Sequence, residues 1–371
     1  MRKIKVMAVF GTRPEAIKMA PVIKELRARN EIEVITCVTA QHRQMLDQVL
    51  ETFKITPDYD LNIMKQGQTL NDVVRGVLEK MGCVLEKEKP DIVLVHGDTT
   101  TTFAGALAAY HSQITIGHVE AGLRTWNKYS PFPEEMNRQM VGCLADMHFA
   151  PTEVSANNLL REGKKKENIY ITGNTAIDAM ATTVTDYYEN PIFDWLGNAR
   201  MILLTAHRRE NLGEPMYRIF RAIKRLVDEF NNVKVVYPIH MNPKIRAIAK
   251  DVFEDCEKVR LIEPLEVFDF HNFENKSYLI MTDSGGIQEE APSLGKPVLV
   301  LRDTTERPEG INAGTLKLIG TDEEVIYRET KRLLTDEAEY NAMSHASNPY
   351  GDGHASERIA EAIIEKFSYL L

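Results

Sequence analysis

Cysteine is scarce in this chain, with four residues among 371, and none of them forms a CxxC pair. Their wide spacing argues against a zinc ribbon or a disulfide framework and is typical of a reducing compartment, so we expect a cytoplasmic protein. No stretch of about 18 apolar residues occurs, and we expect no membrane span. The short apolar run after Lys3 lacks a small-residue cleavage site, which predicts a first strand rather than a signal peptide.

Positive charge is also in deficit, because 45 Lys and Arg face 54 Asp and Glu, for a net charge of −9. An acidic chain is a poor candidate for nucleic-acid binding. No GxGxxG follows an expected strand, so a nicotinamide or flavin cofactor is not expected. With 43% hydrophobic and 27% charged residues, the composition is that of a folded globular protein.

Short apolar runs alternate with amphipathic segments along the chain, which predicts an α/β fold of doubly wound parallel sheets. One sheet rarely takes a dozen strands, so we expect two Rossmann-like domains, at 1–186 and 187–355, with a link near 187–198 and a last helix from residue 356. The expected strands are Ile4–Phe10, Glu33–Thr39, Ile92–His96, Ile114–His118, Met147–Ala150, Ile169–Thr172, Met201–Thr205, Lys234–Pro238, Val259–Ile262, Leu279–Thr282, Val298–Leu301 and Leu316–Ile319.

Unusual polar motifs follow several of these strands, where ligands of doubly wound domains bind, and we expect the active site in a cleft between the two domains. Gly11-Thr12-Arg13-Pro14 opens a helix, so its N–H groups, Arg13 and Lys18 favour an anion site over an ordinary turn. Asp98 precedes four threonines, which is more than one helix cap requires.

Two further acids of the first half are candidates for acid–base chemistry. Glu120 comes directly after a strand, at the same expected edge as Asp98. Glu134 opens a helix after a proline-rich loop, and there its alternative role is to stabilise the helix N-terminus.

The second half carries a histidine and the strongest nucleotide signal. His207 follows a strand and is a candidate acid, base or phosphate donor. Ser284-Gly285-Gly286 offers a hydroxyl and unobstructed N–H groups to a diphosphate, and Glu290 could accept from ribose hydroxyls. Arg307 lies beyond the next strand.

The pairs His96/Asp98 and His118/Glu120 offer ligands that a divalent cation could use. Residues two apart share one face of a strand, and a histidine in a strand more often fills the core. We therefore expect no metal.

Seven strings together resemble the bacterial non-hydrolysing UDP-N-acetylglucosamine 2-epimerases, and the match runs from Phe10 to about Arg358. The strings are GTRPEAIKMAP, VHGDTTTT, HVEAGLRT, PEEMNRQ, LTAHRREN, TDSGGIQEEAPSLGKPVLVLRDTTERPE and NPYGDGHASERI. The resemblance implies two glycosyltransferase-B-type domains, a C-terminal helix (356–371) that crosses back to the first domain, and a homodimer. It also implies interconversion of UDP-GlcNAc and UDP-ManNAc for cell-envelope glycans, without NAD or metal.

The resemblance also assigns roles to particular residues. It implies catalytic carboxylates at Asp98, Glu120 and Glu134 and a histidine at the leaving phosphate at His207. The implied substrate contacts are Arg13, Lys18, Phe270, Ser284, Gly285, Gly286, Glu290 and Arg307. Residues that match an activating second UDP-GlcNAc site in some members are Gln41, Gln44, Arg208 and His240, although Gly67 stands where an arginine is expected.

Three other functions stay open on the sequence. A UDP-sugar-dependent glycosyltransferase would share the fold and the UDP site but would need an acceptor site. A hydrolysing epimerase would have to admit water and often carries a kinase domain, for which this chain has no room. A silent nucleotide-sugar sensor would need the phosphate loop but not three acids and a histidine.

Overall fold

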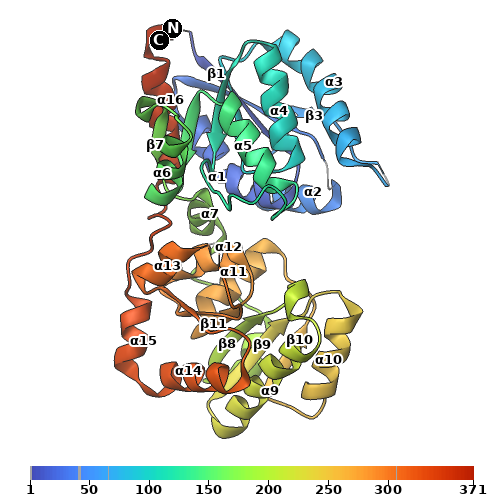
Figure 1. Cartoon of the computed structure of the whole chain (residues 1–371), viewed down its shortest axis with the longest axis vertical. Helices are drawn as coiled ribbons and strands as arrows, with labels where there is room; N and C mark the ends of the chain where they lie inside the picture. The colour runs from blue at the N-terminus through green and yellow to red at the C-terminus, as the bar shows by residue number, and fades with distance from the viewer. Residues whose placement is uncertain (1, 41–42, 66, 306) are drawn as a thin grey trace. The chain divides into compact units, whose positions relative to one another are not determined.

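The computed structural model describes residues 2–40, 43–65, 67–305 and 307–371, with the backbone alone for 43–45. The chain forms two compact units (Figure 1). Unit 1 comprises Met1–Thr182 and Tyr350–Leu371, and unit 2 comprises Thr183–Pro349. The backbone therefore changes units a few residues before the expected boundaries at 186/187 and 355/356. Every helix within the described ranges is too short or too polar to cross a membrane.

Unit 1 is built on a parallel sheet with strand order β3-β2-β1-β4-β5-β6-β7 among the described residues. Its strands are β1 (Ile4–Phe10), β2 (Ile32–Val38), β3 (Tyr59–Asp60), β4 (Ile92–His96), β5 (Thr115–Val119), β6 (Met147–Ala150) and β7 (Ile169–Ile171). Its helices are α1 (Arg13–Ala28), α2 (Arg43–Thr52), α3 (Leu70–Glu88), α4 (Thr100–His111), α5 (Glu134–Leu144), α6 (Glu153–Arg161), η1 (Lys166–Asn168), α7 (Thr175–Thr183, whose last residue belongs to unit 2), α16 (Ala355–Lys366) and η4 (Ser368–Leu370). The strand β3 was not predicted, because two residues are too few to show a periodicity.

Unit 2 has the parallel order β10-β9-β8-β11-β12-β13 in the described part of the chain. Its strands are β8 (Arg200–Thr205), β9 (Val233–Pro238), β10 (Val259–Ile262), β11 (Leu279–Thr282), β12 (Val298–Val300) and β13 (Leu316–Leu318). Its helices are α8 (Pro191–Leu196), η2 (Arg209–Asn211), α9 (Glu214–Glu229), α10 (Pro243–Phe253), α11 (Val267–Lys276), α12 (Gly285–Glu290), η3 (Ala291–Leu294), α13 (Pro308–Ala313), α14 (Glu323–Thr335) and α15 (Glu337–Ser344). The predicted α/β fold with two parallel sheets is confirmed.

The central strands are buried on both faces, which is why they consist of continuous apolar runs. All five residues of β4 are buried, and in unit 2 the β11 strand is buried throughout. Helices must therefore cover both sides of each sheet, and the amphipathic pattern between strands supplies them. The apolar stripe of α9, which includes Ile219, Phe220 and Ile223, packs into the main core of unit 2.

The segment 187–198, expected to link the domains, is instead part of unit 2. It holds the short helix α8, whose Leu196 is buried. Trp195 and Phe193 pack against the second core of this unit, and Phe193 lies 4.9 Å from the ring of Phe273. A six-residue helix is too short to show a clear helical period, so its aromatic anchors were not recognised from the pattern.

The C-terminal helix α16 packs against α1 of unit 1 (Figure 1). The backbone N–H of Asn174 donates to the carbonyl oxygen of Tyr350 at 2.7 Å, where the chain rejoins this unit. The N–H groups of Ala355 and Ser356 donate to the Asp178 carboxylate and satisfy the first turn of the helix.

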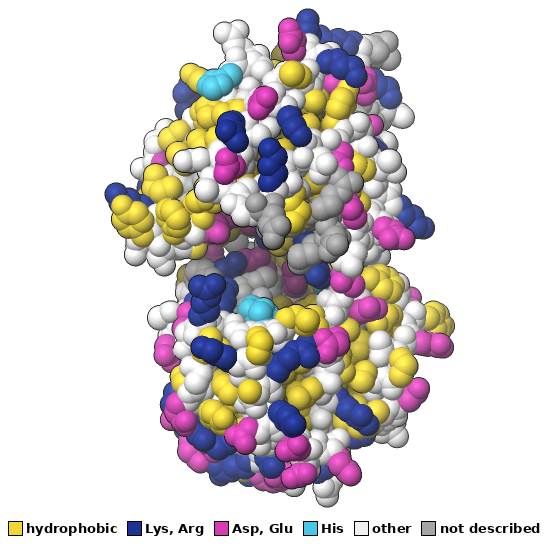
Figure 2. All heavy atoms as spheres, turned by 90° about the vertical axis from the view of Figure 1, so that its right-hand side faces the viewer, with side chains coloured by type: hydrophobic (Ala, Val, Ile, Leu, Met, Phe, Trp, Pro, Cys, Tyr) yellow, Lys and Arg dark blue, Asp and Glu magenta, His cyan; other side chains and the backbone are white. Residues whose placement is uncertain are grey.

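On the face shown in Figure 2, acidic and basic side chains are interspersed over both units. This mixed distribution accords with the small negative net charge of the sequence.

Candidate functional site

Each sheet has one point where the strand order reverses, and ligands of open α/β sheets bind outside the carboxyl ends of the strands at that point. In unit 1 the reversal lies between β1 and β4, and in unit 2 between β8 and β11. The motifs of Arg13 and Asp98 follow the first pair, and those of His207 and Ser284 follow the second. The predicted positions at these two edges are confirmed, while a shared cleft stays a prediction.

Glu120 lies at the first edge in an ion pair with Lys18 from α1. Its backbone adopts a left-handed conformation with φ of 62°, which is uncommon for a residue other than glycine and is typical of functional loops. The Nε2 atom of His96 lies 3.8 Å from Oε2 of Glu120. Burial lowers the pKa of His96 to about 4, so this imidazole is neutral near pH 7.

Two residues of α5 donate hydrogen bonds to Asp98. Its Oδ2 atom accepts from Nε of Arg138 at 2.8 Å, and its backbone oxygen accepts from the amide of Asn137 at 2.8 Å. Burial raises the pKa of Asp98, Arg138 opposes this effect, and the charges of Glu120 and Glu134 raise the pKa further. The charges of both other predicted carboxylates therefore act on Asp98, as expected of groups that gather at one site.

Arg138 was not assigned a role from the sequence, although it stands in the quoted string PEEMNRQ. A signal was present, because Arg138 follows Glu134 by four residues and Glu135 by three, which places all three on neighbouring positions of α5. Glu135 proves to be structural: it is fully buried and accepts from the backbone N–H groups of Thr125 and Trp126.

The anion site expected at the start of α1 is filled by a side chain of the protein itself. Glu15 is buried, and its Oε2 atom accepts from the N–H groups of Gly11 at 3.0 Å and Thr12 at 2.7 Å. These two donors are therefore engaged. The N–H groups of Gly11 and Thr12 are therefore closed to an anion, while an anion contact of Arg13 and Lys18 stays a prediction.

The same carboxylate explains the threonine run. The hydroxyls of Thr99 and Thr102 donate to Oε1 of Glu15, and Thr99 also caps α4 through the amide of Thr102. Thr101 shares a hydrogen bond with Thr39. Three of the four threonines thus have partners within the fold, which accounts for the length of the run beyond a single helix cap.

At the second edge, the buried carboxylate of Asp283 organises the turn that carries His207. Its Oδ2 atom accepts from the backbone N–H groups of His207 and Arg208 and from the side chain of Asn211, at 2.8–3.0 Å. Its Oδ1 atom lies 3.4 Å from Nδ1 of His207. Asp283 stands in the quoted sequence motif, but the pattern did not show that it supports the loop after the neighbouring strand β8.

The His207 ring is 39% exposed and lies parallel to His240, with 5.6 Å between ring centroids. Burial lowers the pKa of His207, the carboxylate of Asp283 opposes this effect, and the nearby Arg208 lowers the pKa further. His207 is thus kept neutral near pH 7. Because a carboxylate oxygen only accepts, the single proton of the neutral imidazole belongs on Nδ1, which faces Asp283, and Nε2 is left as an acceptor.

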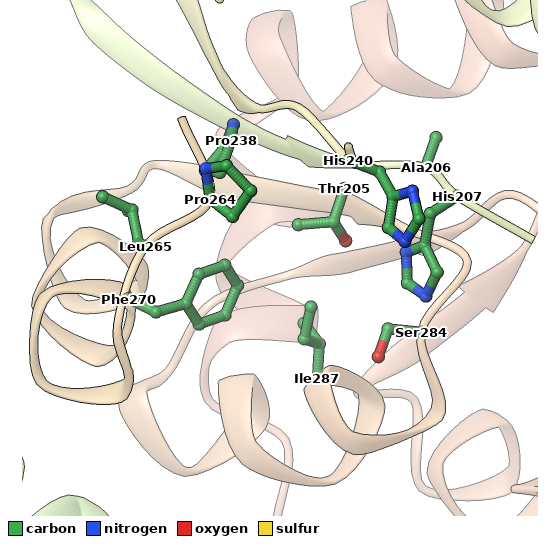
Figure 3. Close-up of a pocket in the computed structure, with 10 residues that line it drawn as sticks. All are labelled: Thr205, Ala206, His207, Pro238, His240, Pro264, Leu265, Phe270, Ser284 and Ile287. Carbon is green, nitrogen blue, oxygen red and sulfur yellow. The ribbon is translucent and has the colours of Figure 1, made fainter. Parts of the chain in front are cut away.

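A pocket of about 200 Å³ opens beside these histidines. Figure 3 shows the Phe270 ring pointing into it, Ile287 and Ser284 along one side, and the stacked rings of His207 and His240 at one end. The remaining lining is mostly apolar, from Ala206, Pro238, Pro264 and Leu265, with Thr205. An apolar slot with an aromatic wall and a few polar groups at one end suits a planar base.

The predicted phosphate loop follows β11. Ser284 precedes α12, and a Cβ atom at Gly285 would stand 2.8 Å from Nη1 of Arg307, so only glycine allows the guanidinium to come this close. The Nε atom of Arg307 donates to Glu289 at 2.9 Å. The loop and a cation are therefore adjacent. Glu290 ends the same helix, with Oε2 3.8 Å from Nε2 of His271.

The candidate activator residues are placed in part. Gln41 and the side chain of Gln44 lie outside the described residues. Arg208 and His240 adjoin His207, where Nε of Arg208 donates to the backbone oxygen of Asp283 at 3.2 Å. Gly67 has a φ of 71°, and a Cβ atom built there would meet nothing within 4 Å. The activator site stays a prediction.

The histidines expected to fill the core do so, and their titration predicts acid sensitivity of unit 1. Burial lowers the pKa of His118 to about 3 and those of His96 and His148 to about 4. The stability they contribute is complete above their ordinary pKa of 6.5 and is lost as the pH falls toward 4, because the unfolded chain takes up protons first. At about pH 5, each of these histidines lowers the free energy of unfolding by about 2 kcal/mol relative to its value above pH 6.5.

Hydrogen exchange of peptides from β5 and β6, followed by mass spectrometry between pH 7 and about pH 5, measures this loss. A His148→Leu variant, with one titrating group fewer, is expected to show a smaller loss of protection on acidification after correction for the intrinsic exchange rate. Equal losses in both proteins would contradict the prediction.

Comparison with known proteins places this arrangement in a family. A model of the family described as UDP-N-acetylglucosamine 2-epimerase matches residues 24–364. A UDP-N-acetylglucosamine 2-epimerase of Bacillus subtilis (strain 168) is 65% identical over 369 residues, which cover 100% of this chain and 97% of the relative.

Solved structures agree. A putative UDP-N-acetylglucosamine 2-epimerase from Listeria monocytogenes superposes with a TM-score of 0.95 at 56% identity, covering 99% of this chain and 97% of the other. The UDP-GlcNAc 2-epimerase from Neisseria meningitidis, solved with UDP-GlcNAc bound, gives a TM-score of 0.87 at 50% identity, covering 97% of this chain and 100% of the other.

Proposed function

The chain belongs to the UDP-N-acetylglucosamine 2-epimerase family, which makes it an isomerase, and from this we propose a specific reaction course on UDP-GlcNAc. UDP is eliminated from C1 and the proton from C2, which gives 2-acetamidoglucal. Addition of a proton to the opposite face of C2 and of UDP to C1 then yields UDP-ManNAc. The reaction is reversible and balanced: one proton leaves C2 and one is added to it, and UDP leaves C1 and is added again.

The chemistry dictates this course. The C2–H bond of the sugar is not next to a carbonyl, so a simple carbanion is too unstable to form. Cleavage of the C1–O bond instead develops oxocarbenium character, which makes the C2 proton removable. A route that uses both faces of C2 needs two acid–base groups, and carboxylates suit this task.

The observation that carries the proposal is the position of Asp98 and Glu120 just after β4 and β5, at one edge of unit 1, where the charges of Glu120 and Glu134 raise the pKa of Asp98. We assign proton transfer at C2 to this group of carboxylates. Burial raises the pKa of Asp98 above its ordinary value, which suits a group that takes up and returns a proton. The ion pair with Lys18 favours the charged form of Glu120.

Unit 2 supplies the nucleotide contacts in this proposal. The pocket beside Phe270 takes the uracil, Ser284 to Gly286 and Arg307 hold the diphosphate, and Glu290 accepts from the ribose. His207 donates to the departing phosphate from Nε2 in its protonated form, in which Nδ1 faces Asp283. The proposal requires that both sets of groups act on one substrate molecule.

The test is incubation of the pure protein with UDP-GlcNAc in deuterated water, followed by NMR. Deuterium at C2 of both UDP-GlcNAc and UDP-ManNAc, with little free ManNAc, is the expected result. Free ManNAc with UDP would instead indicate a hydrolysing enzyme. No exchange and no new sugar would favour the glycosyltransferase or the sensor.

Three wider roles are part of the proposal and rest on the family resemblance. They are a cytoplasmic homodimer, a supply of UDP-ManNAc to cell-envelope glycans, and activation by a second UDP-GlcNAc. Light scattering of the purified chain tests the dimer. Full activity on UDP-ManNAc without traces of UDP-GlcNAc would contradict the activation.

A further inference from the structure

Glu274 is a fully buried carboxyl that the proposed reaction does not use. It lies in α11, next to Phe273 of the second core of unit 2, and none of its surface is exposed. Neither of its oxygens has a hydrogen-bond partner in the described part of the chain. A buried carboxylate without a partner is strongly disfavoured, so the group must be neutralised by a proton or stabilised by a neighbouring group.

Two titratable side chains face Glu274. His271 lies one turn earlier on α11, and Glu290 comes from the end of α12. A ring nitrogen of His271 and one carboxylate oxygen each of Glu274 and Glu290 all lie within 4.8 Å of one another. Apolar residues of neighbouring elements pack in the same core, such as Leu203 of β8 and Phe193 of α8, and η3 has no charged residue. His271 is itself bonded, with Nδ1 2.6 Å from the hydroxyl of Thr183.

Two carboxylates this close, one of them without solvent, do not both stay ionised. Burial raises the pKa of Glu274 well above its ordinary value, and the charge of Glu290 raises it further. Glu290 is 15% exposed in its side chain and keeps access to water. The proton of the pair therefore belongs on Glu274, which then has one O–H group to donate.

We propose that Glu274 is a positioning residue for the nucleotide, which keeps its proton and donates it in a hydrogen bond to one oxygen of Glu290. The other oxygen of Glu290 is then fixed to accept from the ribose hydroxyls. The pair carries one proton and one negative charge. This inference rests on the proposed function, because the ribose contact of Glu290 does.

Two variants separate this role from a contribution to packing. Glu274→Gln keeps the shape and an N–H donor, and the Kd for UDP measured by calorimetry is expected to stay within about threefold of the parent value. Glu274→Leu has no donor, and the Kd is expected to rise about tenfold or more, the usual effect of losing a hydrogen bond to a charged group. The KM for UDP-GlcNAc should follow the Kd, with kcat changed much less.

Thermal unfolding of the same proteins provides the control. Leucine removes a buried carboxyl, so the melting temperature of Glu274→Leu is expected to equal or exceed that of the parent. A purely structural role would lower affinity and melting temperature together. An exposed change on the same helix, Asn275→Leu, controls for altered helix propensity and is expected to leave the Kd unchanged.

Infrared spectroscopy tests the proton directly. The parent protein at neutral pH is expected to show the carbonyl stretch of a protonated carboxyl that is missing in Glu274→Gln. Absence of this band in the parent, or UDP binding by Glu274→Leu as tight as in the parent, would overturn the proposal. So would tight binding of one Zn²⁺ that Glu274→Gln abolishes, since a cation would then stand in place of the proton.

These outcomes are distinguishable from failure of the proposed function. If UDP binds but C2 does not exchange, the reaction course is wrong, and the comparison of the two Glu274 variants still decides the positioning role. If the infrared band is present but UDP does not bind, the positioning role is overturned together with the UDP site.

Discussion

Replacing Asp98 with asparagine is expected to lower kcat for epimerisation about 10²- to 10⁴-fold, the usual effect of removing a general acid or base. Asparagine preserves the size of the side chain and one acceptor oxygen for Arg138, so the contact with α5 is retained. What is lost is the exchangeable proton of a carboxyl whose pKa burial has raised. The Kd for UDP is expected to stay within about threefold, because the proposed UDP contacts belong to unit 2.

The matched control is Asp91→Asn, at the opposite end of the same strand. Asp91 precedes β4 and accepts from the backbone N–H of Lys5 at 2.9 Å, whereas Asp98 follows β4. We expect the control to retain kcat within about twofold. If Asp98→Asn keeps kcat within tenfold of the parent, or if both variants lose activity equally, Asp98 is not an acid–base residue.

Replacing Asp283 with alanine is expected to destabilise unit 2 by about 3–5 kcal/mol and to abolish activity. The change leaves two backbone N–H groups and the Asn211 amide without their acceptor in a buried turn. It also removes the carboxylate beside Nδ1 of His207. Stability and the position of His207 thus depend on the same side chain.

Urea unfolding followed by Trp195 fluorescence measures this loss. Trp195 belongs to unit 2, and Trp126→Phe removes the other of the two tryptophans, so the signal reports on this unit alone. Asp283→Asn, which keeps one acceptor oxygen, is expected to be destabilised less than the alanine variant. Equal stability of the alanine variant and its parent would show that the turn does not depend on Asp283.

The resemblance found in the sequence was sufficient to identify the family, and the pattern was sufficient for the fold class. Alternation of buried apolar runs with amphipathic segments requires parallel sheets covered on both faces. Parallel strands end at one edge, so residues that directly follow strands, such as Asp98, Glu120 and His207, were found at two such edges without knowledge of any contact.

Only the tertiary structure decided which polar groups form hydrogen bonds with one another. Glu15 accepts from the N–H groups of Gly11 and Thr12, which the pattern offered to an anion, and Arg138 reaches Asp98 from a position 40 residues later in the chain. Likewise, the spacing of Glu274 and Glu290 in the sequence does not indicate that these two acids, 16 residues apart, lie close together in the fold. Local pattern reports the environment of one strand or helix, whereas hydrogen-bond partners, burial and pKa depend on which elements pack together.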